Sequence, residues 1–156
     1  MMRKRARMLS VVGILAGGLF GLIASTQTWL DATMNDGAAE SIHVAGADVI
    51  PLLAPLSMAA IALAITLSIA GLAFRYVLGV LAILIAATLF ALNVRLVMNA
   101  SAHDIAGAVT EATGIAGDSA INDMVTGLTQ TPWVTITLLA WIFIVLAGLV
   151  VVATAR

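Results

Sequence analysis

The sequence predicts an all-α integral membrane protein: a bundle of four transmembrane helices with a helical extracytoplasmic loop between the third and fourth helices. Three observations support this prediction. Of the 156 residues, 62% are hydrophobic, only 10% are charged, and four apolar runs are long enough to span a bilayer. A soluble domain usually carries about 25% charged residues, and a soluble protein this apolar would expose large hydrophobic patches. Lipid is therefore the expected environment of most of the chain.

The four apolar runs predict the positions of the helices. A spanning helix needs about 20 consecutive apolar residues. The expected spans cover about 8–30, 50–73, 76–98 and 132–154, joined by outer loops at 31–49 and 99–131 in a single membrane domain, 1–156. The runs lack the two-residue alternation of a membrane β-barrel, so helices are expected.

Charges at the span ends predict the orientation. Basic residues lie before the first span, in the turn between the second and third spans, and at the C-terminus: Arg3, Lys4, Arg5, Arg7, Arg75 and Arg156. All eight carboxylates fall in the two longer loops. Basic residues near span ends stay in the cytoplasm. Both termini are therefore expected in the cytoplasm of a bacterial plasma membrane, with both longer loops outside.

A cleaved signal peptide is the alternative for the N-terminus, which has a basic start and an apolar core. The apolar stretch reaches Leu30 and no clear small-x-small cleavage site precedes Trp29. An uncleaved membrane anchor is therefore the expectation.

Composition and motifs argue against several functions. The net charge of −1 gives no support for nucleic-acid binding, and the absence of cysteine removes disulfides, thiolate catalysis and cysteine metal sites. There is no phosphate-binding loop, no G-x-S-x-G and no pair of aspartates within the spans. A non-enzymatic protein without catalytic residues or cofactor is expected. His43 and His103 lie near loop carboxylates but lack HxxxH or HExxH spacing, so no metal site is expected.

The first span carries a glycine face. Gly13, Gly17 and Gly21 are four residues apart and share one side of a helix. Small residues at this spacing let two membrane helices approach closely. Two interpretations stay open: packing against the chain's own spans, or an interface with a second copy or another membrane protein. The second span offers similar spacing at Ala60, Ala64 and Ser68.

Three tryptophans occupy different depths. Trp29 closes the first span and Trp133 opens the fourth, both at the expected outer interface. Aromatic rings at this level usually anchor helices, although either ring could instead stack on a ligand. Trp141 lies deeper, where its indole N–H is expected to need an acceptor.

Arg95 is the most informative single residue, because it is the one charged residue inside an expected span; Asn93 precedes it by two positions. A charge at this depth either reaches to the interface or marks a functional site that binds an anion or carboxylate. No carboxylate lies within the spans, so the expected partners are Asp31, Asp48 or an acid of the second loop. Asp48, before the second span on the same side, is the preferred one.

The second outer loop predicts two short amphipathic helices. Ser101 and Asp104 fit a capping box, after which apolar residues recur at helical spacing. The first expected helix presents Ile105, Val109 and Ala112, and the second presents Ile121, Met124, Val125 and Leu128. Together they form a cap over the helix ends or a lid over a ligand. Thr131 and Pro132 are expected to start the fourth span.

Three features stand out between about residues 27 and 80: Trp29 after the first span, Gly46-Ala47-Asp48 with Pro51 before the second, and Phe74-Arg75-Tyr76 before the third. In these features the chain resembles the tryptophan-operon-associated conserved membrane protein family of actinobacteria. The resemblance implies a plasma-membrane protein linked to tryptophan metabolism, in transport or sensing. It carries over no catalytic residue.

The leading hypothesis from the sequence is a non-enzymatic accessory or interaction subunit of a membrane complex. The second is a small transporter or binder of an aromatic amino acid such as tryptophan, in which Arg95 meets the carboxylate and Trp29 or Trp133 offers a ring. A membrane enzyme is third, disfavoured by the missing motifs.

Overall fold

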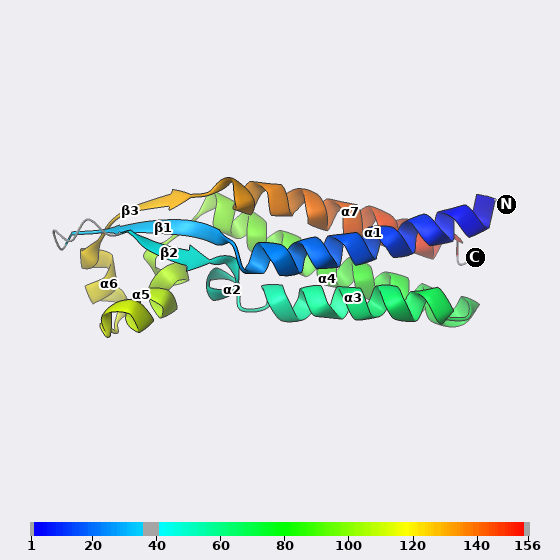
Figure 1. Ribbon diagram of the computed structural model, residues 1–156, viewed down its shortest axis with the longest axis horizontal. Coiled ribbons are helices and arrows are strands. Elements are labelled where there is room, and N and C mark those ends of the chain that lie inside the picture. Colours follow the sequence, from blue (N-terminus) through cyan, green and yellow to red (C-terminus); the bar gives the residue numbers. More distant parts are fainter. Residues whose placement is uncertain (1, 36–40, 155–156) are drawn as a thin grey trace.

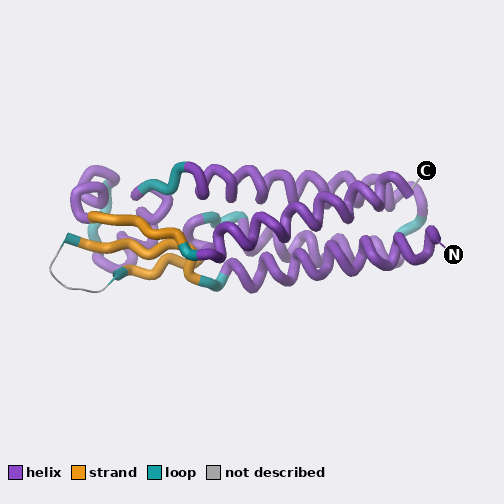
Figure 2. The backbone as a smooth tube through the Cα atoms, turned by 90° about the horizontal axis from the view of Figure 1, so that it is seen from above, coloured by secondary structure: helices purple, strands orange, loops and turns teal. Residues whose placement is uncertain are grey.

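Long helices and a small sheet form an elongated molecule (Figure 1). The computed structural model describes residues 2–35 and 41–154. Helices α1 (Met2–Ser25), α3 (Leu53–Ile69), α4 (Leu72–Met98) and α7 (Pro132–Thr154) run along the long axis as a bundle. Helix α1 begins and α7 ends at one end of this bundle, and the sheet and short helices lie at the other end (Figures 1 and 2).

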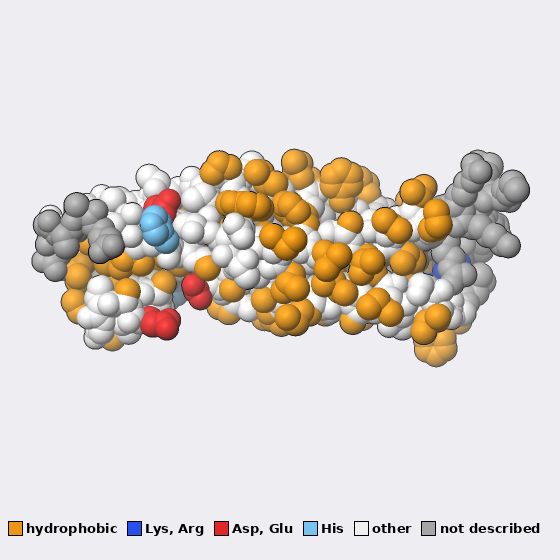
Figure 3. All heavy atoms as spheres, viewed as in Figure 1, with side chains coloured by type: hydrophobic (Ala, Val, Ile, Leu, Met, Phe, Trp, Pro, Cys, Tyr) orange, Lys and Arg blue, Asp and Glu red, His pale blue; other side chains and the backbone are white. Residues whose placement is uncertain are grey.

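The bundle helices have the length and composition of membrane spans, with one shorter member. Among residues 2–35 and 41–154, three helical stretches are apolar and long enough to cross a bilayer: Met8–Ser25, Ala73–Met98 and Pro132–Thr154. Helix α3 is apolar but has 17 residues, about 25 Å at 1.5 Å per residue. On the face drawn in Figure 3, hydrophobic side chains are spread along the whole bundle, whereas acidic and histidine side chains gather toward the sheet end.

Helix α3 is shorter than the predicted span 50–73 at both ends. Pro51 lies in the turn before the helix and Pro55 lies in its first turn. The first N–H groups of a helix have no intrahelical acceptor, so Pro55 costs no helical hydrogen bond there and no kink is needed. The chain turns again at Ala70 and Gly71, which places Arg75 in the first turns of α4 instead of in the connecting turn.

A three-stranded antiparallel sheet corrects the all-α prediction. Strands β1 (Thr28–Met34), β2 (Ile42–Ala45) and β3 (Val125–Gln130) are ordered β2-β1-β3. Val125 and Leu128, assigned from their spacing to a helix, lie in β3. The pairing of β1 with β3 joins segments that are far apart in the chain, a signal that local spacing does not contain.

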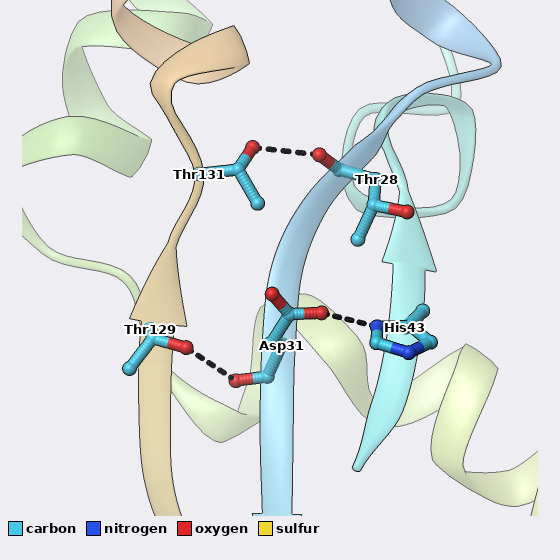
Figure 4. Close-up of polar contacts among 5 residues, drawn as sticks. All are labelled: Thr28, Asp31, His43, Thr129 and Thr131. Atoms are coloured by element: carbon cyan, nitrogen blue, oxygen red, sulfur yellow. Dashed lines mark hydrogen bonds and ion pairs between the residues drawn. The ribbon is translucent and has the colours of Figure 1, made fainter.

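Threonine hydroxyls tie β3 to β1 along the edge shown in Figure 4. The hydroxyl of Thr129 donates to the Asp31 carbonyl at 3.4 Å, and the hydroxyl of Thr131 donates to the Thr28 carbonyl at 2.6 Å. The Thr131 N–H also donates to the Trp29 carbonyl at 2.9 Å. Because α1 leads into β1 and β3 leads into α7, these bonds fix the sheet to the bundle.

The second loop contains the two predicted short helices, α5 (Ala106–Thr113) and α6 (Asp118–Met124), preceded by the 3₁₀ turn η1 (Ala102–Ile105). The capping box of Ser101 and Asp104 is confirmed. Apolar side chains on one side of these helices are buried: Ile105, Val109 and Ile121. We call the sheet, η1, α5, α6 and the single-turn helix α2 (Gly46–Val49) the cap.

The glycine face of α1 packs within the chain, on α7. A Cβ placed on Gly13 would lie 3.3 Å from Ala147, and one on Gly17 would lie 2.4 Å from Ile144. On Gly21 it would lie 2.4 Å from the ring of Trp141. The nearest neighbours of these glycines do not include Ala60, Ala64 or Ser68. Ala60 and Ala64 are buried in α3, and Ser68 is exposed.

A second close contact joins α4 to α7. A Cβ on Gly79 would lie 2.9 Å from Val151, and one on Gly148 would lie 2.7 Å from Ile83. Helix α7 therefore packs closely against both α1 and α4, and α1 also packs against α3, where a Cβ on Gly18 would lie 2.9 Å from Ile61. The sequence does not indicate the α4–α7 contact, because Gly79 and Gly148 lie on different helices and form no repeated spacing within either one.

Candidate functional site

A pocket opens where the bundle meets the cap, and we call it the cap-side pocket. It has a volume of about 220 Å³ and lies between the residues that precede α3, the last turns of α4, and η1. Its lining residues are Val49, Ile50, Pro51, Leu52, Leu92, Arg95, Leu96 and Asp104. One side chain of each charge therefore shares a small, otherwise aliphatic pocket.

Arg95 reaches the pocket from the last turn of α4. A cation suits this place because the C-terminal end of a helix carries a partial negative charge. The two salt bridges formed among the described residues pair His43 with Asp31 and His103 with Asp118, so no described carboxylate lies within 4 Å of the guanidinium. Arg95 is exposed and keeps its fork of N–H donors available for a ligand.

Asp104 supplies the opposite charge from a fixed position. Its Oδ2 atom accepts hydrogen bonds from the Ser101 N–H at 2.9 Å and from the Ser101 hydroxyl at 2.8 Å. Both bonds use the same oxygen, which leaves Oδ1 free to accept from a ligand. The capping box therefore orients the carboxylate as well as starting η1.

The predicted ion pair between Asp48 and Arg95 is absent from the described part of the chain. Asp48 is exposed on α2 and does not line the pocket, whereas its neighbour Val49 does. The single turn of α2 directs Val49 and Ile50 to the pocket and leaves Asp48 outside it. Asp104 is the acid that shares the pocket with Arg95.

Neither expected aromatic residue lines the pocket. Trp29 is fully buried in β1 and its indole N–H donates to the Ala24 carbonyl at 2.8 Å, so it is a core residue and not an interfacial anchor. Trp133 is half-buried at the start of α7, with its ring centroid 6.1 Å from that of Phe20. Stacking of either ring on a ligand in this pocket has no geometric support.

Two polar groups deeper in the bundle have no hydrogen-bond partner among the described residues. Asn93 is fully buried in α4 with both amide atoms unpaired, and the indole N–H of the buried Trp141 lacks the acceptor expected for it. Asn93 does not line the cap-side pocket. Such groups are costly in an apolar interior.

The histidines pair with carboxylates on the cap. Nδ1 of His43 on β2 hydrogen bonds to Oδ1 of Asp31 on β1 (Figure 4), and Nδ1 of His103 lies 3.5 Å from an oxygen of Asp118. Within residues 2–35 and 41–154, no three potential metal ligands come together.

A wider apolar groove lies along the membrane-facing side of the bundle, between α1 and α7. Its volume is about 380 Å³, and its lining residues are Gly13, Ala16, Gly17, Phe20, Ile136, Leu139, Ala140 and Phe143. The groove contains no ionisable side chain, so it offers no chemistry beyond apolar contact.

Comparison with protein families decides the identity. The family model described as Tryptophan-associated transmembrane protein matches residues 11–156. The chain belongs to this family. Comparisons with curated proteins and with solved structures find no match. Membership confirms the resemblance inferred from Trp29, Gly46-Ala47-Asp48 and Phe74-Arg75-Tyr76, and with the apolar helices it identifies a multi-pass membrane protein.

The pocket itself was only half predicted. Arg95 stands out in the sequence as a charge within an apolar run. The sequence indicates Asp104 as a capping residue and as one of several loop acids within reach of Arg95, and the capping box places it in the first turn after α4, nine positions beyond Arg95. That short separation was the available signal that these two charges lie close together.

Proposed function

We propose that this member of the Tryptophan-associated transmembrane protein family is a non-enzymatic four-span protein of the bacterial plasma membrane. In this proposal both termini are cytoplasmic, the cap is outside, and the cap-side pocket binds a small apolar molecule that carries a carboxylate. The observation that supports it is the environment of Arg95: a cation beside aliphatic walls, with no described carboxylate within 4 Å.

The chemistry follows from that environment. The planar guanidinium forms two parallel hydrogen bonds to a carboxylate. The aliphatic walls remove apolar surface of the ligand from water. The described residues that line the pocket include no nucleophile, metal cluster or pair of acids, so binding is the activity that these groups support best.

Four crossings are consistent with the charge pattern although α3 has only 17 residues. This length lies at the lower end of the range for a spanning helix. Arg75, near the turn after α3, and the basic residues before the first span then lie on one side. The carboxylates of the cap lie on the other, as the positive-inside rule requires.

Ligand binding to the purified full-length protein tests the proposal. Thermal unfolding in detergent is measured with L-tryptophan, L-leucine and 4-methylpentanoate, and Kd values are then obtained by calorimetry. At least one compound is expected to stabilise the protein, by about 2.7 kcal/mol at 100 times its Kd. The Arg95→Gln variant is expected to bind it about 10- to 100-fold more weakly, because a hydrogen-bonded charge contributes about 1.5–3 kcal/mol.

Lys4→Gln is the matched control, because it removes one positive charge from α1 at the opposite end of the bundle. It is expected to leave the Kd unchanged. If no compound stabilises the wild type, or if Arg95→Gln binds as tightly as the wild type, the proposed binding function is wrong.

An accessory subunit is the second candidate function, and the apolar groove between α1 and α7 favours it. Ala16 is exposed in this groove, and its small side chain lets another membrane helix approach closely. Ala16→Leu is expected to fill the groove and weaken association with a partner, while Gly13 and Gly17 keep their contacts with α7. Crosslinking in native membranes measures this, and a crosslinking pattern identical in wild type and variant would contradict the role.

A further inference from the structure

We propose that the ligand of the cap-side pocket is a zwitterion, with its anionic group on Arg95 and a primary ammonium on Asp104. This inference rests on the proposed binding function and specifies its ligand class. The two charged side chains reach the pocket from different elements, α4 and η1, and they line it together without forming an ion pair with each other.

The hydrogen bonds of Asp104 explain why the two charges stay apart. Ser101 holds Oδ2 through its N–H and its hydroxyl, so the carboxylate is committed to η1. Rotation toward Arg95 would sacrifice these bonds and uncap the turn. A ligand carrying both charges satisfies Arg95 and the free Oδ1 at the same time, and neither side chain has to move.

The lining also selects the kind of ammonium. Quaternary ammonium groups are recognised by aromatic cages, and the pocket lining contributed by residues 2–35 and 41–154 contains no aromatic side chain. A primary ammonium instead presents three N–H donors, which a carboxylate oxygen accepts. The remaining walls, formed by residues such as Leu52 and Leu92, suit an apolar substituent.

Two sources supply an adjacent anion and primary ammonium at this level of the membrane. One is a free α-amino acid with an apolar side chain. The other is the headgroup of an ethanolamine phospholipid, whose phosphate also forms paired hydrogen bonds with arginine. The recognition chemistry is the same for both, so separate experiments must distinguish them.

The amino-acid arm uses three related probes on the full-length protein in lipid-free detergent: L-tryptophan, 3-indolepropionate, which lacks the ammonium, and tryptamine, which lacks the carboxylate. The wild type is expected to bind L-tryptophan at least about tenfold more tightly than either analogue, because each analogue lacks one hydrogen bond between charged groups. Asp104→Asn keeps an acceptor for the cap but removes the charge. It is expected to reduce the preference for L-tryptophan over 3-indolepropionate to about one.

Asp48→Asn is the matched control, because it makes the same change at an exposed acid of the cap that does not line the pocket. It is expected to keep the wild-type preference for L-tryptophan over 3-indolepropionate. Equal binding of L-tryptophan and 3-indolepropionate by the wild type would overturn the zwitterion inference but leave anion binding at Arg95 intact.

The lipid arm uses nanodiscs containing either phosphatidylethanolamine or phosphatidylcholine, with retained lipid measured by native mass spectrometry. Retention of phosphatidylethanolamine over phosphatidylcholine by the wild type, lost in Asp104→Asn, supports the inference with a lipid as the source. If the amino-acid probes do not bind in that case, the proposed soluble ligand is wrong and the zwitterion site stands. If the wild type shows no preference for the zwitterion in the amino-acid arm and none in the lipid arm, the proposed zwitterion site is wrong.

Discussion

The indole ring of Trp29 lies directly against the backbone of Gly46. A Cβ on Gly46 would lie 2.6 Å from both Nε1 and Cε2 of Trp29, and 3.0 Å from the Ala24 carbonyl that accepts the indole N–H. The tryptophan after the first span and the glycine before the second, two features behind the family resemblance, are therefore one contact. This contact joins the end of α1, the sheet and the approach to the cap-side pocket.

Gly46→Ala is predicted to destabilise the protein by about 1–3 kcal/mol, because the extra methyl group overlaps a fully buried ring. Thermal unfolding in detergent measures the loss. Gly107→Ala is the control, because Gly107 lies in α5 and a Cβ there meets nothing within 4 Å. Alanine favours a helix over glycine by about 0.5–1 kcal/mol, so this variant should be as stable as the wild type or more stable.

Within the glycine face, Gly21→Ala is predicted to lower the Tm more than Gly13→Ala. The added Cβ at Gly21 would lie 2.4 Å from the rigid ring of Trp141 and 2.5 Å from the Ser57 hydroxyl. At Gly13 it would lie 3.3 Å from the Ala147 methyl, which needs only a small shift. Equal losses of stability would show that the face does not pack on α7 as described.

Asn93→Leu is predicted to raise the free energy of unfolding. The amide is fully buried and neither of its polar atoms has a partner among the described residues. Replacing it with a similar apolar side chain removes a desolvation cost of about 1–3 kcal/mol. Asn93→Asp is the opposite control and should destabilise, since it buries a charge. A large loss of stability in Asn93→Leu would mean that the amide has a partner in the membrane.

The proposed orientation predicts opposite labelling of two single-cysteine variants, which are simple to make because the chain contains no cysteine. Ser119→Cys lies on α6 in the cap, and Gly71→Cys lies between α3 and α4 at the other end. A membrane-impermeant maleimide added to intact cells should label the former and label the latter only after lysis. Labelling of both from outside would contradict four crossings with cytoplasmic termini.

The bundle helices could be predicted because a long apolar run is a local signal. The strands could not, since β1 pairs with β3 through contacts such as Thr33 with Gly127, which are 94 positions apart. The spacing of Val125 and Leu128 fits a helix equally well. This segment forms a strand because it pairs with β1, and no local pattern in the sequence identifies that partner.

The charged pocket could likewise be predicted only in part, from the residue whose signal is local. Arg95 is conspicuous because a charge inside an apolar run is rare. Its neighbouring acid was predicted to be Asp48 from its position along the chain, but the turn of α2 leaves that side chain outside the pocket. Trp29 was likewise predicted to be an anchor at the membrane interface. This prediction was wrong because the burial of Trp29 depends on Gly46 and on the sheet, which no local pattern indicates.

Protection of a cysteine in the pocket tests the proposed site most directly. Leu52 lines the pocket and is 51% exposed, so Leu52→Cys in intact cells should react with an impermeant maleimide added outside. Saturating L-tryptophan, or whichever probe binds most tightly, should slow this reaction at least about tenfold by occupying the pocket. The same probe should leave labelling of Ser119→Cys unchanged. An unaltered rate at Leu52→Cys in the presence of saturating probe would contradict a binding site at this pocket.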